Sequence, residues 1–265
     1  MDSTWLSNGG RWESYVFLGA LFCFALLETF RPLRAPQLST TRRWLNHGVL
    51  LAISAVLNIV VFRGGAVLFA ILITAKGYGL LNKFALNYPL RFAAGFLAAD
   101  LMHYVSHRIY HRIPFLWRIH RVHHTDPDFD VTTSFRFHPF ESLLTQAANF
   151  AVIALFGPPV MAVLAAEIVT LFQDIFEHAN IEVPPALDRI LQVFLISPSM
   201  HRIHHSTLIT DQNRNFGTIV PWWDRLFGTF APSATTEFET GLQGYPKEHS
   251  ASLVHTLKMP FNKVE

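Results

Sequence analysis

The feature that most constrains this chain is a five-residue histidine pattern that occurs twice, about eighty residues apart. Residues 120–124 and 201–205 both read His-x-x-His-His. On a helix, positions i, i+3 and i+4 lie on one face, so we expect each copy to point three imidazoles at one spot. A third pattern places His103, His107 and His111 at i, i+4 and i+8. Because neutral imidazole is the commonest protein ligand for transition metals, these patterns predict a site for two ions.

The composition favours a membrane protein. Hydrophobic residues make up 51% of the 265 residues and charged residues only 15%, whereas an ordinary soluble domain carries about 25% charged residues. A formal net charge of +2 gives no electrostatic argument for a nucleic-acid partner. Cys23 is the single cysteine, which rules out an intramolecular disulfide. No basic region precedes the first apolar run, so no signal peptide is expected.

The apolar segments predict an all-α integral membrane protein with a bundle of about four to five transmembrane helices. A membrane-crossing helix needs roughly 20 apolar residues. Apolar runs of this kind occupy residues 15–30, 44–62, 86–102, 143–156 and 160–176. The run 66–75 is shorter and flanked by glycines, which favours a re-entrant or interfacial piece. Gly157-Pro158-Pro159 is a natural tight turn, so the last two runs should form a hairpin.

Charge in the short loops predicts the orientation. Arg31, Arg34, Arg42 and Arg43 lie in the first loop, which should therefore be cytoplasmic, with the N-terminus outside. Counting crossings then brings every histidine pattern to the cytoplasmic side, in a bacterial inner membrane. The segments 104–140 and 179–265 should form a histidine-rich cytosolic helical cap. We expect an N-terminal transmembrane region (1–94), a histidine-rich region (95–230) and a C-terminal tail (231–265) that is loosely held from Pro246 onward, within one structural unit.

The candidate site residues follow from clustering and from position at the ends of apolar runs. The predicted metal ligands are His107, His111, His120, His123, His124, His178, His201, His204 and His205. Residues expected either as ligands or as hydrogen-bond partners of ligating histidines are His103, His138, Asp100, Asp174 and Asp224. Lone histidines are usually ordinary surface or core residues, and this interpretation holds for His47, His249 and His255. No separate acid or base and no organic cofactor site is predicted.

The type of ligand limits the metal. Structural zinc takes four ligands, usually with cysteine, and catalytic zinc takes three and a water. Two ions, each with four to five nitrogen ligands, account for the number of candidate histidines more simply than either kind of zinc site. All-nitrogen ligation with open positions favours iron that activates O2, because magnesium and calcium require oxygen ligands. Zinc could still occupy the site in a purified sample. A metal site at a membrane surface indicates a lipid chain as the substrate.

These motifs carry a family resemblance. His107 and His111, the two His-x-x-His-His boxes, Asn215-Phe216 and the run 223–229 resemble the fatty acid hydroxylase/sterol desaturase superfamily over residues 95 to 230. The stretch 136–141 is similar to a bacterial-type branch. The resemblance implies a helical membrane bundle with a cytosolic cap and a non-haem di-iron domain in 95–230. It also implies hydroxylation or desaturation of a fatty acyl, sterol or related lipid with O2 and external electrons.

Some features differ from relatives in that superfamily. Asp174 and His178 stand where some fatty acid 2-hydroxylases carry two histidines. No fused cytochrome domain is expected, these residues show no glycine fingerprint for a nucleotide, and one cysteine cannot hold an iron–sulfur cluster. A separate electron donor, namely a ferredoxin, cytochrome or reductase, is therefore implied.

Two other functions remain as alternatives to the oxygenase. A membrane metal transporter would place its ligands near the middle of the bilayer. A zinc-dependent membrane hydrolase would need few ligands and a glutamate as acid and base.

Overall fold

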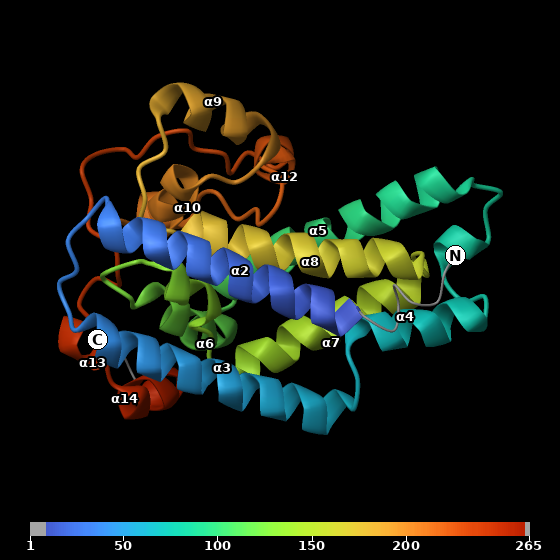
Figure 1. The fold of residues 1–265 in the computed structure, drawn as a ribbon, viewed down its shortest axis with the longest axis horizontal. Coiled ribbons are helices and arrows are strands. Elements are labelled where there is room, and N and C mark those ends of the chain that lie inside the picture. The colour runs from blue at the N-terminus through green and yellow to red at the C-terminus, as the bar shows by residue number, and fades with distance from the viewer. Residues whose placement is uncertain (1–8, 263–265) are drawn as a thin grey trace.

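The structure is a computed structural model that describes residues 9–262, with side chains from residue 11 onward. In this part of the chain the regular elements are helices, and the extended pairing is limited to one isolated bridge between Ser206 and Thr240. The long helices are α2 (Gly9–Phe30), α3 (Thr40–Phe62), α5 (Tyr88–Arg112), α7 (Pro139–Phe156) and α8 (Val160–His178). Figure 1 shows them running along the long axis of the molecule, so the all-helical prediction is confirmed.

Local sequence sets where these helices begin and end. Asn87 and Ser39 cap α5 and α3, each accepting a hydrogen bond from a backbone amide of the first turn, which satisfies donors that a helix start leaves free. Pro139 stands in the first turn of α7, where its missing N–H costs nothing. Gly157 ends α7 with φ 60°, a left-handed conformation that glycine adopts without strain. The predicted hairpin turn therefore joins α7 to α8.

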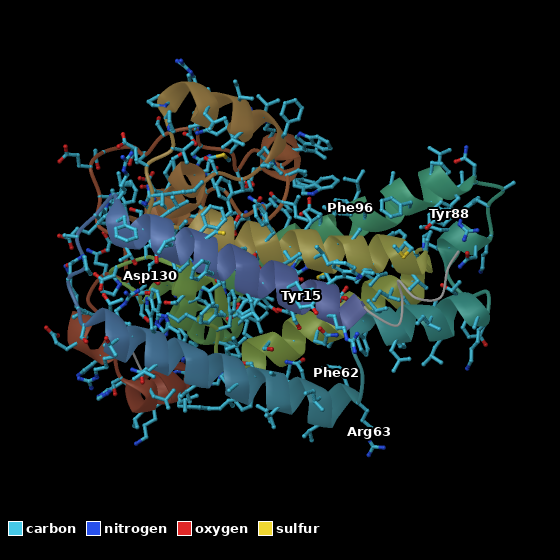
Figure 2. The ribbon with its side chains drawn as sticks, in the orientation of Figure 1. Tyr15, Phe62, Arg63, Tyr88, Phe96 and Asp130 are labelled. Atoms are coloured by element: carbon cyan, nitrogen blue, oxygen red, sulfur yellow. The ribbon has the colours of Figure 1, made fainter. Side chains whose placement is uncertain are left out.

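The bundle is formed by pairwise packing of these helices. Helix α2 lies along α8, α3 lies along α7, and α5 contacts both α7 and α8. Many of the outward side chains are apolar and exposed, among them Phe22 at 67%, Ile59 at 69% and Tyr15, which is labelled in Figure 2, at 63%. Exposed apolar surface of this extent on a helical bundle is typical of a surface that faces lipid.

Three stretches among the described residues are long and apolar enough to cross a membrane, namely Arg11–Phe30, Thr40–Asn82 and Pro139–Phe156. The second stretch includes the short helix α4 (Ala66–Ala75) and the turn η1 (Leu80–Asn82). Ten helical residues extend only about 15 Å, half the thickness of a hydrocarbon core. Figure 1 shows α4 continuing beyond the end of α3, and its buried Ala66 and Ala70 pack against Ile153 and Val163. One face of the 66–75 segment thus packs against α7 and α8, whereas its Leu68 and Leu72 side chains are exposed at 50% and 52%.

One end of the bundle carries the short helices. These are α6 (Pro114–His124), η2 (Val131–Phe135), α9 (Pro185–Phe194), α10 (Pro198–His204), α11 (Ile209–Gln212), α12 (Trp222–Leu226), α13 (Lys247–Ser250), α14 (Leu253–Lys258) and η3 (Met259–Phe261). Helices α2, α5 and α8 all end on this side of the molecule (Figure 1). The histidine patterns on α5, α6, α8 and α10 are thereby brought to a common end.

The C-terminal segment is held more firmly than its polar sequence suggests. Arg121 of the first box donates hydrogen bonds to the carbonyl oxygens of Met259 and Asn262. Asn46 of α3 donates to the carbonyl of Ala251. Met259 is 1% exposed. The expectation of a loosely held tail from Pro246 is wrong for residues 246–262, because α6 and α3 supply partners for its backbone.

A buried ion cluster fixes the loop that follows the first histidine box. Arg43 of α3 is 1% exposed; its Nε donates to Asp126 Oδ1 at 2.9 Å and its Nη1 to Asp130 Oδ2 at 2.7 Å. The Asp128 carboxylate lies 3.5 Å from the Arg43 Nε. His47 is fully buried beside this cluster, bonded to Thr132. Arg43 therefore forms ion pairs with three aspartates, and His47 is a satisfied core residue as the sequence indicates.

Candidate metal centre

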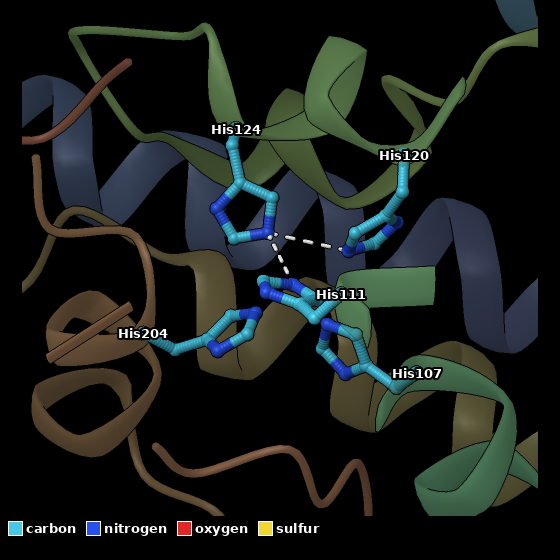
Figure 3. A group of neighbouring side chains, drawn as sticks. All are labelled: His107, His111, His120, His124 and His204. Carbon is cyan, nitrogen blue, oxygen red and sulfur yellow. Dashed lines mark hydrogen bonds between the residues drawn. The ribbon is translucent and has the colours of Figure 1, made fainter. Parts of the chain in front are cut away.

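Two groups of histidines lie side by side where the helices converge. The first, which we call the five-histidine site, consists of His107, His111, His120, His124 and His204 (Figure 3). The second, the four-histidine site, consists of His123, His178, His201 and His205. In each group the candidate donor atoms lie within 4.8 Å of one another. The nine histidines that the sequence predicts as ligands are thus gathered in the structure, from α5, α6, α8 and α10.

The histidines of each box are divided between the two sites, which the spacing of the pattern does not predict. In the first box His120 and His124 belong to the five-histidine site and His123 to the four-histidine site. In the second box the division is reversed: His204 joins the five-histidine site, whereas His201 and His205 join the other. Positions i and i+4 differ little in direction on a helix, but successive residues differ by about 100°. Each box therefore reaches both sites instead of one spot.

The ring nitrogens of each group converge closely. In the four-histidine site, His178 Nε2 lies 3.0 Å from His201 Nε2 and 3.2 Å from His123 Nε2. In the five-histidine site, His124 Nε2 lies 3.1 Å from His111 Nε2 and 3.2 Å from His120 Nε2, as the dashed lines in Figure 3 show. Several Nε2 atoms pointing at one another are the arrangement expected around a cation.

Hydrogen bonds to the other ring nitrogen fix which nitrogen faces inward. His107 Nδ1 lies 3.0 Å from the carbonyl oxygen of Phe216, His204 Nδ1 lies 2.8 Å from that of Arg214, and His178 Nδ1 lies 2.7 Å from that of Asp174. A carbonyl oxygen can only accept, so each Nδ1 carries the hydrogen and each Nε2 presents a lone pair. The Nε2 atoms of His107 and His204 are buried without a hydrogen-bond partner. These unpartnered lone pairs fit a transition-metal ion.

Burial favours the neutral, metal-binding form of these rings. Desolvation, reinforced by the neighbouring His120, lowers the pKa of His204 to about 3. Burial first, and the neighbouring histidines second, hold the pKa of His123, His124, His201 and His205 well below the usual value. Ligation requires a deprotonated nitrogen, so the site is prepared for metal at neutral pH.

The predicted acidic partners have other roles. Asp100 accepts hydrogen bonds from the amide of Ile219 and from Trp223 Nε1, not from a histidine. Asp224 accepts from the amides of Phe216 and Gly217 at 2.8 Å, so it positions the carbonyl that holds His107. Both acids therefore fold the 215–224 loop against α5 rather than contact a ligating ring.

Asp174 lines the cavity beside the histidines, and its backbone carbonyl orients His178. His103 and His138 lie outside both histidine sites. His103 lines the same cavity as Asp174. His138 caps the start of α7 by accepting from the Phe140 amide, and its Nε2 is 3.3 Å from the Leu257 carbonyl.

Two glutamates also contact the histidine sites, and only Glu177, at the end of an apolar run, is indicated by the sequence as a possible partner of a ligating histidine. Glu141 Oε1 lies 2.6 Å from His120 Nδ1, the carboxylate–histidine pairing common in metal sites. Glu177 Oε1 lies 3.6 Å from His201 Nε2, and its Oε2 is buried without a partner. The signal for Glu141 is its place in the stretch 136–141, three residues after His138. Glu177 immediately precedes the predicted ligand His178.

Replacing Glu141 by leucine should lower metal affinity or activity about 10- to 100-fold, because His120 loses the acceptor that fixes its ring. Glu141→Gln keeps an acceptor oxygen and should cost less. Metal content by elemental analysis after dialysis against a chelator measures the effect. The exposed Glu248→Leu is the matched control. An unchanged metal affinity in Glu141→Leu would show that His120 needs no such support.

A cavity of about 250 Å³ adjoins both histidine sites. Its wall includes His107 and His120 from the five-histidine site and His123, His178 and His201 from the four-histidine site. A molecule in this cavity can contact both sites at once.

The fold and this centre define a class of protein: a helical protein with candidate membrane spans and two adjacent all-histidine sites suited to transition metals. The chain belongs to the fatty acid hydroxylase family, whose profile matches residues 92–229, a little over half of the chain. The predicted resemblance is thereby confirmed. No solved structure is significantly similar to it.

Among curated proteins, the ornithine lipid hydroxylase OlsE of Rhizobium tropici is 28% identical over 67% of this chain and 53% of its own length. The alkylglycerol monooxygenase of Danio rerio is 31% identical over 52% of this chain and 30% of its own length. The methylsterol monooxygenase 1 of Gallus gallus is 32% identical over 49% of this chain and 42% of its own length. The chain therefore spans about half or less of the length of these relatives.

Proposed function

We propose that this chain is a membrane-bound non-haem di-iron oxygenase that uses O2 and external electrons to hydroxylate or desaturate a C–H bond of a lipid. The observation that carries this proposal is the 250 Å³ cavity whose wall includes histidines of both sites. A bound substrate would lie against the two metals together. The relatives named as hydroxylases and monooxygenases of lipids support the same reaction class.

The two sites would hold one iron each, through five nitrogens in one and four in the other. When bound, this pair supplies activation of O2, which side chains alone cannot supply. The protein contributes orientation: the carbonyls of Phe216 and Arg214 hold His107 and His204 with their lone pairs inward. Glu177 offers an unpartnered carboxylate oxygen in the cavity wall, available as a further ligand or to hold a proton.

The membrane arrangement that we propose adds α5 and α8 to the three candidate spans, giving five crossings, within the predicted range of four to five, with the histidine end in the cytoplasm. The N-terminus then faces outside, and the membrane is the bacterial inner membrane. The basic segment with Arg108, Arg112 and Arg118 at the histidine end supports this orientation. A ferredoxin, cytochrome or reductase would supply electrons from the same side.

Lipid extracts of an overexpressing bacterial strain, grown with and without O2, test the proposal by mass spectrometry. We expect a lipid that gains one oxygen or loses two hydrogens only in the aerobic culture. The matched control is a strain that expresses His201→Ala at the same level, which should lack the product. Identical aerobic and anaerobic extracts from the wild-type strain would contradict the proposal.

A further inference from the structure

A second cavity continues from the first one into the bundle. It has a volume of about 290 Å³ and shares His103, Thr145 and Gln146 with the 250 Å³ cavity at the histidine sites. Its wall is formed by α5, α7 and α8, with Glu13 of α2 at one side. Because the two cavities have wall residues in common, one elongated molecule can extend through both.

Polar side chains interrupt the otherwise mostly apolar walls of these two cavities. Ser142, Thr145, Gln146 and Asn149 stand at i, i+3, i+4 and i+7 of α7, which places them on one face of the helix. All four line one or both of the cavities. Polar side chains inside a membrane bundle are costly, and they commonly mark a substrate path.

Some of these groups have partners within the protein and others do not. Ser142 Oγ accepts from Asn58 at 2.5 Å, and the Thr145 hydroxyl lies 2.9 Å from that of Tyr110. The carboxyl groups of Glu13 and Glu167 in the same wall hydrogen-bond each other. These polar groups are therefore already paired.

Within residues 11–262 the side chains of His103, Gln146 and Asn149 make no hydrogen bond, although all three line the inner cavity. Their donors and acceptors are available to a molecule in that cavity. His103 lies four residues before the candidate metal ligand His107, a rise of about 6 Å along the axis of α5. A polar group bound there would lie close to the reacting carbon.

A third cavity offers a place for an apolar chain. It has a volume of about 180 Å³ and shares Phe137, Ser142 and Asp174 with the first cavity. The rest of its wall is largely apolar, with Phe17, Leu51, Phe135 and Leu171. The cavity at the histidine sites thus shares wall residues with two further cavities, one that carries several polar side chains and one whose wall is more apolar.

We propose that His103, Gln146 and Asn149 form a polar subsite that binds the hydroxyl or amide group of the lipid substrate inside the bundle. This inference rests on the proposed function and narrows its substrate class. The polar group occupies the inner cavity, the hydrocarbon chain the third cavity, and the carbon between them lies beside the two histidine sites. Oxidation should therefore occur within a few bonds of the polar group and not far along the chain.

Equilibrium binding to the detergent-purified full chain tests the subsite. Tritiated 1-hexadecanol is the probe, and unlabelled 1-hexadecanol and hexadecane are the competitors. The wild type should prefer the alcohol by at least about tenfold, because hexadecane leaves the three polar groups without a partner. The double variant Gln146→Leu/Asn149→Leu should reduce the preference severalfold or more, and adding His103→Phe should bring the ratio close to one.

The control is Val152→Ala, which lies in the same cavity wall on the same helix but removes no hydrogen-bonding group. It should keep the preference for the alcohol. Metal content and thermal unfolding of each variant check that it folds, and the single variant Gln146→Met replaces any that does not. Equal binding of alcohol and alkane by the wild type, or an undiminished preference in the polar-to-apolar variants, would overturn the inference.

Binding is measured without O2 or electrons, so this result is independent of the oxidation. A wild type that prefers the alcohol but oxidises no lipid would contradict the proposed function and leave the subsite standing. A wild type that oxidises a lipid but binds both probes equally would contradict the subsite alone.

Discussion

Replacing His123 and His201 together by alanine is expected to leave a chain that holds about one metal ion, because both belong to the four-histidine site, which keeps only half of its ligands, while the five-histidine site keeps all of its own. Replacing His124 and His201 together should instead remove one ligand from each site, so that more of the metal is retained. The two double variants differ only in which of two adjacent residues is changed. Metal per chain, measured by elemental analysis of the purified protein, distinguishes them.

Activity should fall more than about 100-fold in either double variant, since even the loss of a hydrogen-bond partner to a ligand commonly costs 10- to 100-fold. His249→Ala is the control: His249 stacks on His255 near the C-terminus and should leave metal and activity unchanged. If both double variants lost the same amount of metal, the division of each box between two sites would be wrong.

Replacing Arg43 by methionine should lower the free energy of unfolding by about 3 to 5 kcal/mol, the usual cost of removing one partner from a buried ion pair. The change leaves Asp126 and Asp130 buried without their main cationic partner. Because that loop directly follows His124, metal binding should weaken as well. Thermal or denaturant unfolding in detergent measures the stability.

The neighbouring Arg42 provides the matched control because its side chain is exposed. Arg42→Met should change stability by no more than about 0.5 kcal/mol. Arg43→Lys keeps the positive charge but loses the planar guanidinium that contacts two aspartates at once. Its free energy of unfolding should therefore lie between those of Arg42→Met and Arg43→Met. Equal stability of Arg42→Met and Arg43→Met would mean that the aspartates need no counter-charge.

Much of the helical architecture could be predicted from the sequence. The apolar runs predict α2, α3, α7 and α8 because a helix that crosses the hydrocarbon core of a membrane needs about 20 consecutive apolar residues. The 66–75 segment is predicted less well, since ten apolar residues suit several placements. Its packing against Ile153 and Val163 depends on where α7 and α8 lie. The C-terminal segment is predicted poorly for the same reason: its partners, Arg121 and Asn46, are far away in the chain.

The set of candidate ligands follows from spacing, because histidines three and four residues apart on short helices must lie near one another. Their division does not follow from spacing. Whether His123 or His124 faces a given site depends on the rotation of α6 relative to α10 and α5. The role of Glu141 likewise depends on the start of α7 lying beside His120.

The sequence by itself determined the chemistry of the ligands, the helices that carry them and the family, since these depend on residue type and local periodicity. Only the tertiary structure decided which histidines act together, because each site combines residues from helices far apart in the chain. It also decided which nitrogen of a ring faces inward, since the carbonyls of Phe216 and Arg214 that orient His107 and His204 lie in loops without periodicity. Each His-x-x-His-His box therefore supplies candidate ligands to both of the adjacent histidine sites.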